Sequence, residues 1–326
     1  MILLCQAQAD TTALKTDREE TDMDTKKTGR RRMGTTGVIR KMQPYLYILP
    51  LFILLGVFKL YSSVYAIYRS FFEWDGGRIS VFIGIQNYIA LLTDATFGKS
   101  LVNLFILLVT SVLKVVTVPL LVAELVMSVK RQFSSNLYKY LLIIPMVVPG
   151  VVMILLWRWI YDYNGLLNGI LSTLGLENLM HSWLGEQATA LGALIFYQFP
   201  WVTGIQFLIF LAGLQSIDTS IYEATRIDGI GPVSRLFYID IPLLTGQFRY
   251  LIITTIISTF QAFEHVLIMT NGGPGDSTMV PALHMYNETF SYYNMGYACA
   301  MGTVLFLFTL GVTAFNMKYI KGVDSQ

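Results

Sequence analysis

Six long apolar runs constrain the fold of this chain more than any other feature. A helix needs about 20 apolar residues to cross the hydrocarbon core of a membrane, and each run is long enough. Of the 326 residues, 54% are hydrophobic and only 13% are charged, whereas soluble domains carry about 25% charged residues. We therefore predict an all-α integral membrane protein with six transmembrane helices, at about residues 45–70, 100–127, 138–161, 188–214, 247–270 and 296–318.

The distribution of lysine and arginine predicts the orientation of these helices, since an even number of spans places both termini on one side. Seventeen of the 23 Lys and Arg residues fall in the two termini and in segments 128–139 and 215–249. Three fall in the opposite segments and three lie inside the runs. By the positive-inside rule, both termini are cytoplasmic. We expect residues 1–43 to be a disordered basic tail, 44–320 the transmembrane domain and 321–326 a cytoplasmic C-terminal tail.

Residues 218–246 are the longest polar interruption in the second half of the chain, and their pattern predicts two short helices joined by a turn. Ser220 stands three residues before Glu223, so the pair can form a capping box at the start of the first helix. Gly229 fits the left-handed residue that ends a helix, and Pro232 fits the first position of the next helix. A capped hairpin of this kind offers a rigid surface to a partner.

An ordered set of residues runs through this hairpin. Glu223-Ala224-Thr225 is followed after three residues by Gly229, and later by Ile239 and Ile241-Pro242. This spacing resembles the EAA signature of bacterial ABC-importer permeases, although Thr225 replaces the usual alanine. In that family the loop docks into a groove of a separate ATPase; the alternative is an ordinary cytoplasmic helix-turn-helix. The resemblance implies an ATPase-coupling loop that contains Glu223, Ala224, Thr225, Asp228, Gly229 and Pro242.

Three segments on the other side of the membrane carry further resemblances. They are the runs Ile83–Tyr88 with Asp94–Phe97, a short helix predicted to end at Gly175, and the turn Thr270-Asn271-Gly272-Gly273-Pro274. These runs are similar to those of sugar-type permeases. The last run is typical of the maltose-permease-like subunit of a heterodimer, and a homodimer of this chain is the alternative.

The chain carries no motif for binding or hydrolysing ATP. The sequence lacks a G-x-x-x-x-G-K-[ST] phosphate-binding loop, and it also lacks the H-E-x-x-H and G-x-S-x-G motifs. Cys5 and Cys299 stand far apart without ligand-like neighbours. We expect a non-enzymatic membrane subunit that binds no cofactor, with ATP and magnesium held by a separate ATPase.

The fifth run carries polar residues on one face of its expected helix. Thr254, Ser258, Gln261 and His265 follow at helical intervals, and Glu264 lies beside them. Ionisable groups inside a membrane usually face protein or water. This face is therefore a candidate substrate pathway, in which Gln261, Glu264 and His265 bind sugar hydroxyls. The alternative is hydrogen bonding between helices.

The fourth run supplies a second candidate face. Tyr197, Trp201 and Gly204 share it, and Gln198 is adjacent. Because sugars present C–H faces that stack on aromatic rings, we add Gln198 and Trp201 to the candidate pathway. Packing around a proline kink is the alternative. Lys114 lies in mid-span, where it could pair with a carboxylate of a neighbouring subunit; the alternative is that the span is shifted along the chain.

These features together predict the transmembrane permease subunit of an ABC importer in the bacterial cytoplasmic membrane, forming half of the pathway for a sugar or oligosaccharide. The resemblance implies its partners: a second homologous permease, a dimeric ABC ATPase, an extracytoplasmic solute-binding protein, membrane lipid and the sugar, but no nucleic acid. The few positive residues of the expected pathway disfavour an anion. The alternatives are a glycerol-phosphate-type or amino-sugar substrate, an ion-coupled secondary transporter, and a membrane enzyme such as a glycosyltransferase.

Overall fold

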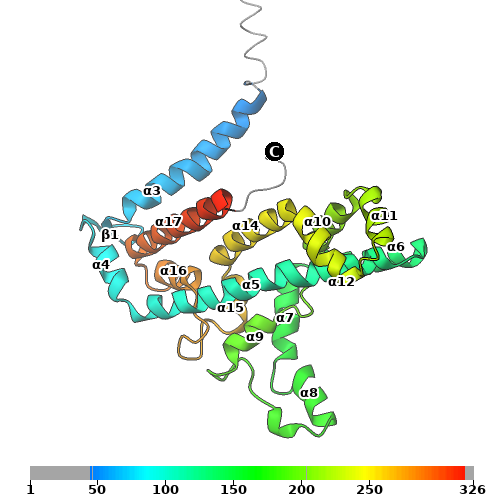
Figure 1. Ribbon diagram of the computed structural model, residues 1–326. Coiled ribbons are helices and arrows are strands. Elements are labelled where there is room, and N and C mark those ends of the chain that lie inside the picture. The colour runs from blue at the N-terminus through cyan, green and yellow to red at the C-terminus, as the bar shows by residue number, and fades with distance from the viewer. Residues whose placement is uncertain (1–44, 46, 203, 320–326) are drawn as a thin grey trace, which may run out of the picture. The chain divides into compact units, whose positions relative to one another are not determined.

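Helices make up almost all of the regular structure in the computed structural model, which describes residues 45, 47–202 and 204–319 (Figure 1). The chain divides into two units, residues 1–64 and 65–326. The described part of the first unit is helical, and almost all of its side chains are exposed. The predicted tails lie outside the described residues.

The helices and strands of the described residues succeed one another from the N-terminus. They are η1 (Gly56–Tyr61), α3 (Ser62–Arg69), β1 (Phe72–Trp74), β2 (Ser80–Phe82), α4 (Gln86–Thr93), α5 (Ala95–Ser128), α6 (Gln132–Ile143), η2 (Ile144–Val147), α7 (Gly150–Ile160), α8 (Leu166–Thr173), η3 (Glu177–Leu179), α9 (Ala190–Phe196), α10 (Gly204–Gln215), α11 (Thr219–Ile227), α12 (Pro232–Arg235), η4 (Leu236–Asp240), α13 (Ile241–Leu243), α14 (Thr245–Gln261), α15 (Glu264–Met269), α16 (Pro281–Phe290) and α17 (Met295–Tyr319).

Three of the described helices are long and apolar enough to cross a membrane singly, namely Tyr47–Arg69, Ala95–Ser128 and Met295–Lys318. Three further pairs of helices pass the same test together but are bent, one by 93° and two by 72°. By length and composition, the described residues therefore supply up to six spans. The prediction of an all-α membrane fold is confirmed, and the strands of the described residues form one antiparallel pair, β1 with β2.

The run predicted as one span at 138–161 is bent by 93° because it contains two prolines. Pro145 lies in the 3₁₀ turn η2, and Pro149 is the residue that precedes α7. Val148 is extended (φ −72°, ψ 128°), as expected for a residue that precedes proline.

The predicted fourth and fifth spans are interrupted as well. Between α9 and α10, the helix stops at Phe196 and resumes at Gly204. Between α14 and α15, it stops at Gln261 and resumes at Glu264, because Ala262 is extended (φ −76°, ψ 120°). The expectation of one continuous helical face from 254 to 265 is therefore wrong.

Helix α5 packs against α10 and α14, while α17 packs against α14, α16 and α4 (Figure 1). The interior between α5, α10 and α14 is filled by large apolar side chains, and Phe207 and Phe210 of α10 are completely buried there. Burial of side chains of this size is worth about 1.5–3 kcal/mol each where the surroundings are aqueous. These three helices form the base that positions both candidate sites.

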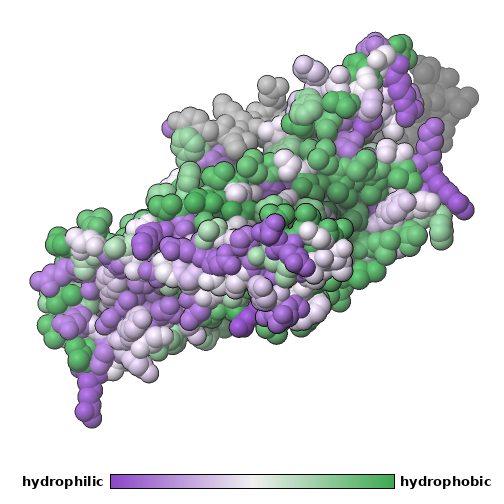
Figure 2. Space-filling view, turned by 90° about the horizontal axis from the view of Figure 1, so that it is seen from below, coloured by the Kyte–Doolittle hydropathy of each residue, from purple (hydrophilic) through white to green (hydrophobic). Residues whose placement is uncertain are grey.

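Apolar side chains also cover much of the outside of the protein. Figure 2 shows broad green areas on the face it presents, with hydrophilic residues gathered in separate groups. Leu113, Leu121 and Leu125 of α5 are among the exposed apolar residues. A soluble monomer rarely exposes apolar patches larger than a few hundred Å². This surface fits a lipid environment, as the composition predicts.

Asp94 joins three helices at the start of α5. Its carboxylate accepts hydrogen bonds from the backbone N–H groups of Thr96 (2.8 Å) and Phe97 (3.2 Å). It also accepts one from the hydroxyl of Tyr297 on α17 (2.8 Å) and lies 2.8 Å from Nε2 of His284 on α16. Burial alone would raise the pKa of Asp94, but these hydrogen bonds outweigh it and lower the pKa below its ordinary value.

Candidate functional site

The first candidate site is the hairpin of residues 218–246, whose first helix is α11. Asp218 caps this helix, because its carboxylate accepts a hydrogen bond from the backbone N–H of Ser220 at 2.8 Å. The predicted capping box of Ser220 and Glu223 is therefore wrong. The helix begins earlier than expected, at Thr219, so Glu223 lies inside it and is exposed.

The turn after α11 has the predicted left-handed glycine. Gly229 has φ +69°, and its N–H donates to the carbonyl of Arg226 (3.3 Å) while that of Ile230 donates to the carbonyl of Thr225 (3.0 Å). This pair of hydrogen bonds is the Schellman motif of a helix end. A Cβ at position 229 would meet nothing within 4 Å, so the requirement for glycine is conformational and not steric.

The second half of the hairpin begins as predicted, with Gly231 as the cap and Pro232 in the first turn of α12. The helix continues through the π-helical stretch η4, and Pro242 lies one residue before its end at Leu243. A bend of 72° then separates it from α14. The hairpin is thus bent by 72° from α10 on one side and by 72° from α14 on the other.

One arginine ties the hairpin to α5. The Arg235 guanidinium lies 2.5 Å from a carboxylate oxygen of Glu124 on α5 and 2.9 Å from one of Asp240, whose side chain is completely buried. The same guanidinium lies over the ring of Tyr222 on α11, at 5.1 Å from the ring centroid. These contacts join α5, α11 and the second half of the hairpin at one point.

The outward surface of the hairpin combines apolar and acidic side chains. Ile227 is 86% exposed, Val233 68% and Tyr238 80%. Of the predicted coupling residues, Glu223, Ala224, Asp228, Gly229 and Pro242 are exposed, whereas Thr225 is buried and its hydroxyl donates to the carbonyl of Tyr222 (2.8 Å). An exposed apolar surface on a rigid, well-capped hairpin is suited to binding another protein.

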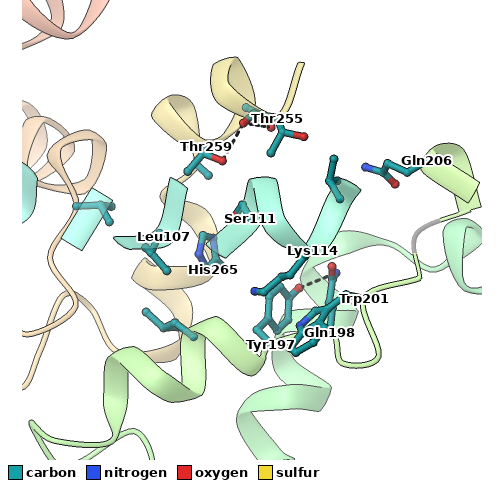
Figure 3. A pocket seen from close by; sticks show the side chains of 15 residues that line it. Leu107, Ser111, Lys114, Tyr197, Gln198, Trp201, Gln206, Thr255, Thr259 and His265 are labelled. Atoms are coloured by element: carbon teal, nitrogen blue, oxygen red, sulfur yellow. Dashed lines mark hydrogen bonds between the residues drawn. The ribbon is translucent and has the colours of Figure 1, made fainter. Parts of the chain in front are cut away.

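The second candidate site is a cavity of about 300 Å³ beside α5. Its lining residues come from α5, α9, α10, α14 and α15, from the 197–201 segment between α9 and α10, and from Ala262 and Val280 between helices (Figure 3). The polar and aromatic members are Ser111, Lys114, Tyr197, Gln198, Trp201, Gln206, Thr255, Ser258, Thr259 and His265.

Aromatic contacts fix the shape of this cavity. The rings of Tyr197 and His265 stack at 5.8 Å with an angle of 5° between their planes. Gln198 donates a hydrogen bond from Nε2 to the hydroxyl of Tyr197 at 3.1 Å (Figure 3). Gln198 and Trp201 both have positive φ, of 63° and 61°. Non-glycine residues in this conformation cost of order 1–3 kcal/mol each and cluster at functional sites.

Four of the six predicted pathway residues lie together here, and two do not. Gln198, Trp201, Ser258 and His265 line the cavity. Gln261, the last residue of α14, and Glu264, the first residue of α15, are exposed and line none of the described cavities. Thr254 lines a neighbouring cavity of about 600 Å³, which shares Gln198 and Ser258 with the first.

Lys114 is the main lining residue that the sequence pattern did not place in the pathway. It donates a hydrogen bond to the carbonyl of Ile195 at the end of α9. Its Nζ also lies 5.0 Å from the ring centroid of Trp201. The signal was present in the sequence, as a cation in mid-span without an assigned partner, but its neighbours are 81 and 87 positions further along the chain.

The lining offers hydroxyls, amides, an imidazole, an ammonium group and aromatic rings. Such a set can hydrogen-bond a polar ligand and stack against its apolar faces. Among the described residues, no group of three or more His, Cys, Asp or Glu side chains is placed to hold a metal ion. The geometry is therefore that of a binding or passage site.

Comparison with known proteins agrees with this geometry. Residues 115–320 match the family described as "Binding-protein-dependent transport system inner membrane component". The chain is 31% identical over 289 residues to the sulfoquinovosyl glycerol transport system permease protein SmoG of Agrobacterium fabrum, covering 86% of this chain and 90% of that protein. It is 31% identical over 279 residues to the lactose transport system permease protein LacF of Rhizobium radiobacter, covering 84% and 92%.

A solved structure is similar in fold over most of the chain. It is a crystal structure of a bacterial alginate ABC transporter in complex with an alginate pentasaccharide-bound periplasmic protein, with 18% sequence identity and a TM-score of 0.75. The match covers 86% of this chain and 95% of that one. From the matched family and the length of these alignments, this chain belongs to the family of binding-protein-dependent transport system inner membrane components.

Proposed function

We propose that this chain is a permease subunit of an ATP-driven importer and forms half of the translocation pathway for a saccharide. The observation that carries the proposal is the hairpin of residues 218–246. Five of the six residues that match the family's signature lie on its exposed surface, and Thr225 is buried. The hairpin ends α11 in a left-handed glycine, and Arg235 joins it to α5. The saccharide is supported by the cavity lining and by the saccharides in the names of the relatives.

The partners follow from the family and from what this chain lacks. A dimeric ATPase, with its own ATP and magnesium, docks on the hairpin. A second permease completes the pathway, and an extracytoplasmic binding protein delivers the saccharide. The chain itself catalyses no reaction and binds no cofactor, and both of its termini are cytoplasmic. Closure of the ATPase moves the hairpin, and the ion pair between Arg235 and Glu124 passes this movement to α5.

The test is a substitution at the turn of the hairpin. Gly229→Val is expected to lower saccharide uptake about five- to thirtyfold, because a β-branched residue cannot adopt φ +69° without strain of about 1–2 kcal/mol. The amount of protein in the membrane should stay unchanged. Gly229→Asn is the matched control, since asparagine tolerates the left-handed conformation, and it should keep most of the uptake.

Uptake should also stop when cellular ATP is depleted and should persist when ionophores collapse the ion gradients. Wild-type uptake by Gly229→Val would contradict the coupling role of the hairpin. Uptake that follows the ion gradient and not ATP would contradict the importer itself and favour an ion-coupled transporter.

A further inference from the structure

Lys114 brings a positive charge into the cavity, and the cavity holds no negative charge to balance it. Among the described residues that line the cavity there is no Asp or Glu. The ion pairs of the described residues do not include Lys114 either. An ammonium group inside a membrane-spanning bundle is costly unless it is paired or faces water, so such residues mark ion or substrate pathways.

The contacts of Lys114 leave part of its hydrogen-bonding capacity free. An ammonium group has three N–H donors, and the carbonyl of Ile195 accepts from one of them. The ring of Trp201 faces the charge at 5.0 Å from its centroid but accepts no ordinary hydrogen bond. Two donors thus remain for a ligand in the cavity.

A second donor group lies beside them. Nε1 of Trp201 is buried and has no acceptor among the described residues. Figure 3 shows Lys114 and Trp201 side by side against the cavity. A buried donor without a partner costs about 1–3 kcal/mol, but this nitrogen is closed to the cavity, so Lys114 carries the contact with a ligand. A cationic donor with two free N–H groups and no counter-charge suits an oxyanion better than a hydroxyl.

Resting on the proposed function, we propose that the transported saccharide is acidic and that its carboxylate, sulfonate or phosphate group binds the ammonium group of Lys114. The sugar ring then lies near Tyr197, Gln198 and His265, where stacking and amide contacts are available. This reverses the expectation from sequence that the pathway disfavours an anion. That expectation counted few positive residues because Lys114 was not assigned to the pathway.

The substrate can be identified without choosing it in advance. Cells with the complete importer, and cells with this gene deleted, would be given a mixture of uronate oligosaccharides, phosphorylated and sulfonated sugars, and the neutral counterpart of each. Mass spectrometry of the medium would then show which sugars disappear only when the gene is present. We expect an acidic sugar to be depleted and its neutral counterpart to remain.

Variants of Lys114 then test the contact itself. Lys114→Gln keeps a donor for the carbonyl of Ile195 but loses the charge, and it should lower uptake of the acidic sugar about ten- to hundredfold, the usual weight of a hydrogen bond to a charged group. Lys114→Arg should retain most of the uptake. Lys59→Gln, a neutralised lysine on the exposed surface of the first span, should have no effect.

The outcomes separate this inference from the function on which it rests. Gene-dependent depletion of a neutral sugar would uphold the importer and overturn the acidic substrate. Equal uptake by Lys114→Gln and wild type, or equal loss in Lys114→Gln and Lys114→Arg, would also overturn it. If no sugar were depleted in a gene-dependent way, the importer and the acidic substrate would both be rejected.

Discussion

Among single residues, Asp94 is notable because its side chain alone connects three helices, α5, α16 and α17. Its carboxylate caps α5 and also contacts His284 and Tyr297 on two other helices. These helices are far from α5 in the sequence, so the contacts hold together the end of α5 opposite the hairpin. Hydrogen bonds to a charged group contribute about 1.5–3 kcal/mol each when they are well shielded from water.

We expect Asp94→Asn to lower the free energy of unfolding by about 1–3 kcal/mol, because the amide keeps one acceptor but loses the charge. The measurement is the thermal unfolding of the purified protein in detergent. Glu73→Gln, which neutralises an exposed carboxylate on β1, is the control and should change the melting temperature little. Equal melting temperatures for wild type and Asp94→Asn would contradict the stabilising role of the Asp94 carboxylate.

The acid sensitivity of the protein should report on the same residue. The pKa of Asp94 is lowered from its ordinary value of 3.8 in the folded protein, so the stability it contributes is fully present above the unfolded pKa. It is lost as the pH falls through the folded pKa. As the pH falls below about 4, wild type should progressively lose its advantage over Asp94→Asn. An advantage that stays constant over that range would contradict the assignment.

The residues that could be predicted well from the sequence are those whose role is local. Gly229 is required by the helix end in which it stands, and the neighbouring pattern reveals that end. Lys114 and Trp201 could not be placed in the same way, because their contact joins positions 87 residues apart. The positive φ of Trp201 has no signal in its own residue type. The capping box of Ser220 and Glu223 was a wrong prediction, because Asp218 occupies the N-cap position that was expected for Ser220.

Among the helices and their connections, the attachment of the hairpin to α5 is the feature most closely connected with coupling. Two carboxylates, Glu124 and Asp240, face the single guanidinium of Arg235. Removal of one member of a buried ion pair costs about 3–5 kcal/mol, since it leaves a charge without compensation. The cluster is therefore sensitive to which of its members is changed.

We expect Arg235→Gln to destabilise the protein by about 3 kcal/mol and to lower uptake more than it lowers ATP hydrolysis by the complex. In this variant, the carboxylates of Glu124 and Asp240 would lie close together without a cation. Asp240→Asn is the matched variant, because it leaves one carboxylate with one guanidinium, and it should lower stability less than Arg235→Gln does. The ratio of uptake to ATP hydrolysis in proteoliposomes measures the coupling. Equal losses in both variants would show that the three charges do not form one balanced cluster.

The positions of the helices could be predicted from the apolar runs, but their bends could not. Apolar length marks where a chain can lie in a membrane, and this holds for α5 and α17. It says nothing about direction within a run. The 93° bend contains Pro145 and Pro149, whereas the break at Ala262 has no proline at all. Of the three predicted residues next to that break, only His265 lines the cavity, and Gln261 and Glu264 are exposed.

In the chain as a whole, the two proposed functional surfaces are the cavity beside α5 and the exposed hairpin of residues 218–246. The cavity beside α5 and the hairpin are both built on the base formed by α5, α10 and α14. Movement of the hairpin would therefore reach the cavity through packed helices and would not need a flexible linker. The sequence predicted the two surfaces separately, whereas their common base required the tertiary contacts.

The transport role proposed for this chain depends most on the proposed docking of the hairpin on a separate ATPase. It is tested by purifying the tagged chain gently in detergent after crosslinking from a photoreactive residue at Ile227, which is 86% exposed on the hairpin. The same probe at Leu174, which is 65% exposed in the segment after α8, is the control. We predict that an ATPase and a second permease co-purify in comparable amounts and that only the probe at position 227 crosslinks to the ATPase. Recovery of the intact chain alone, or ATPase crosslinks from position 174 and none from 227, would contradict this docking.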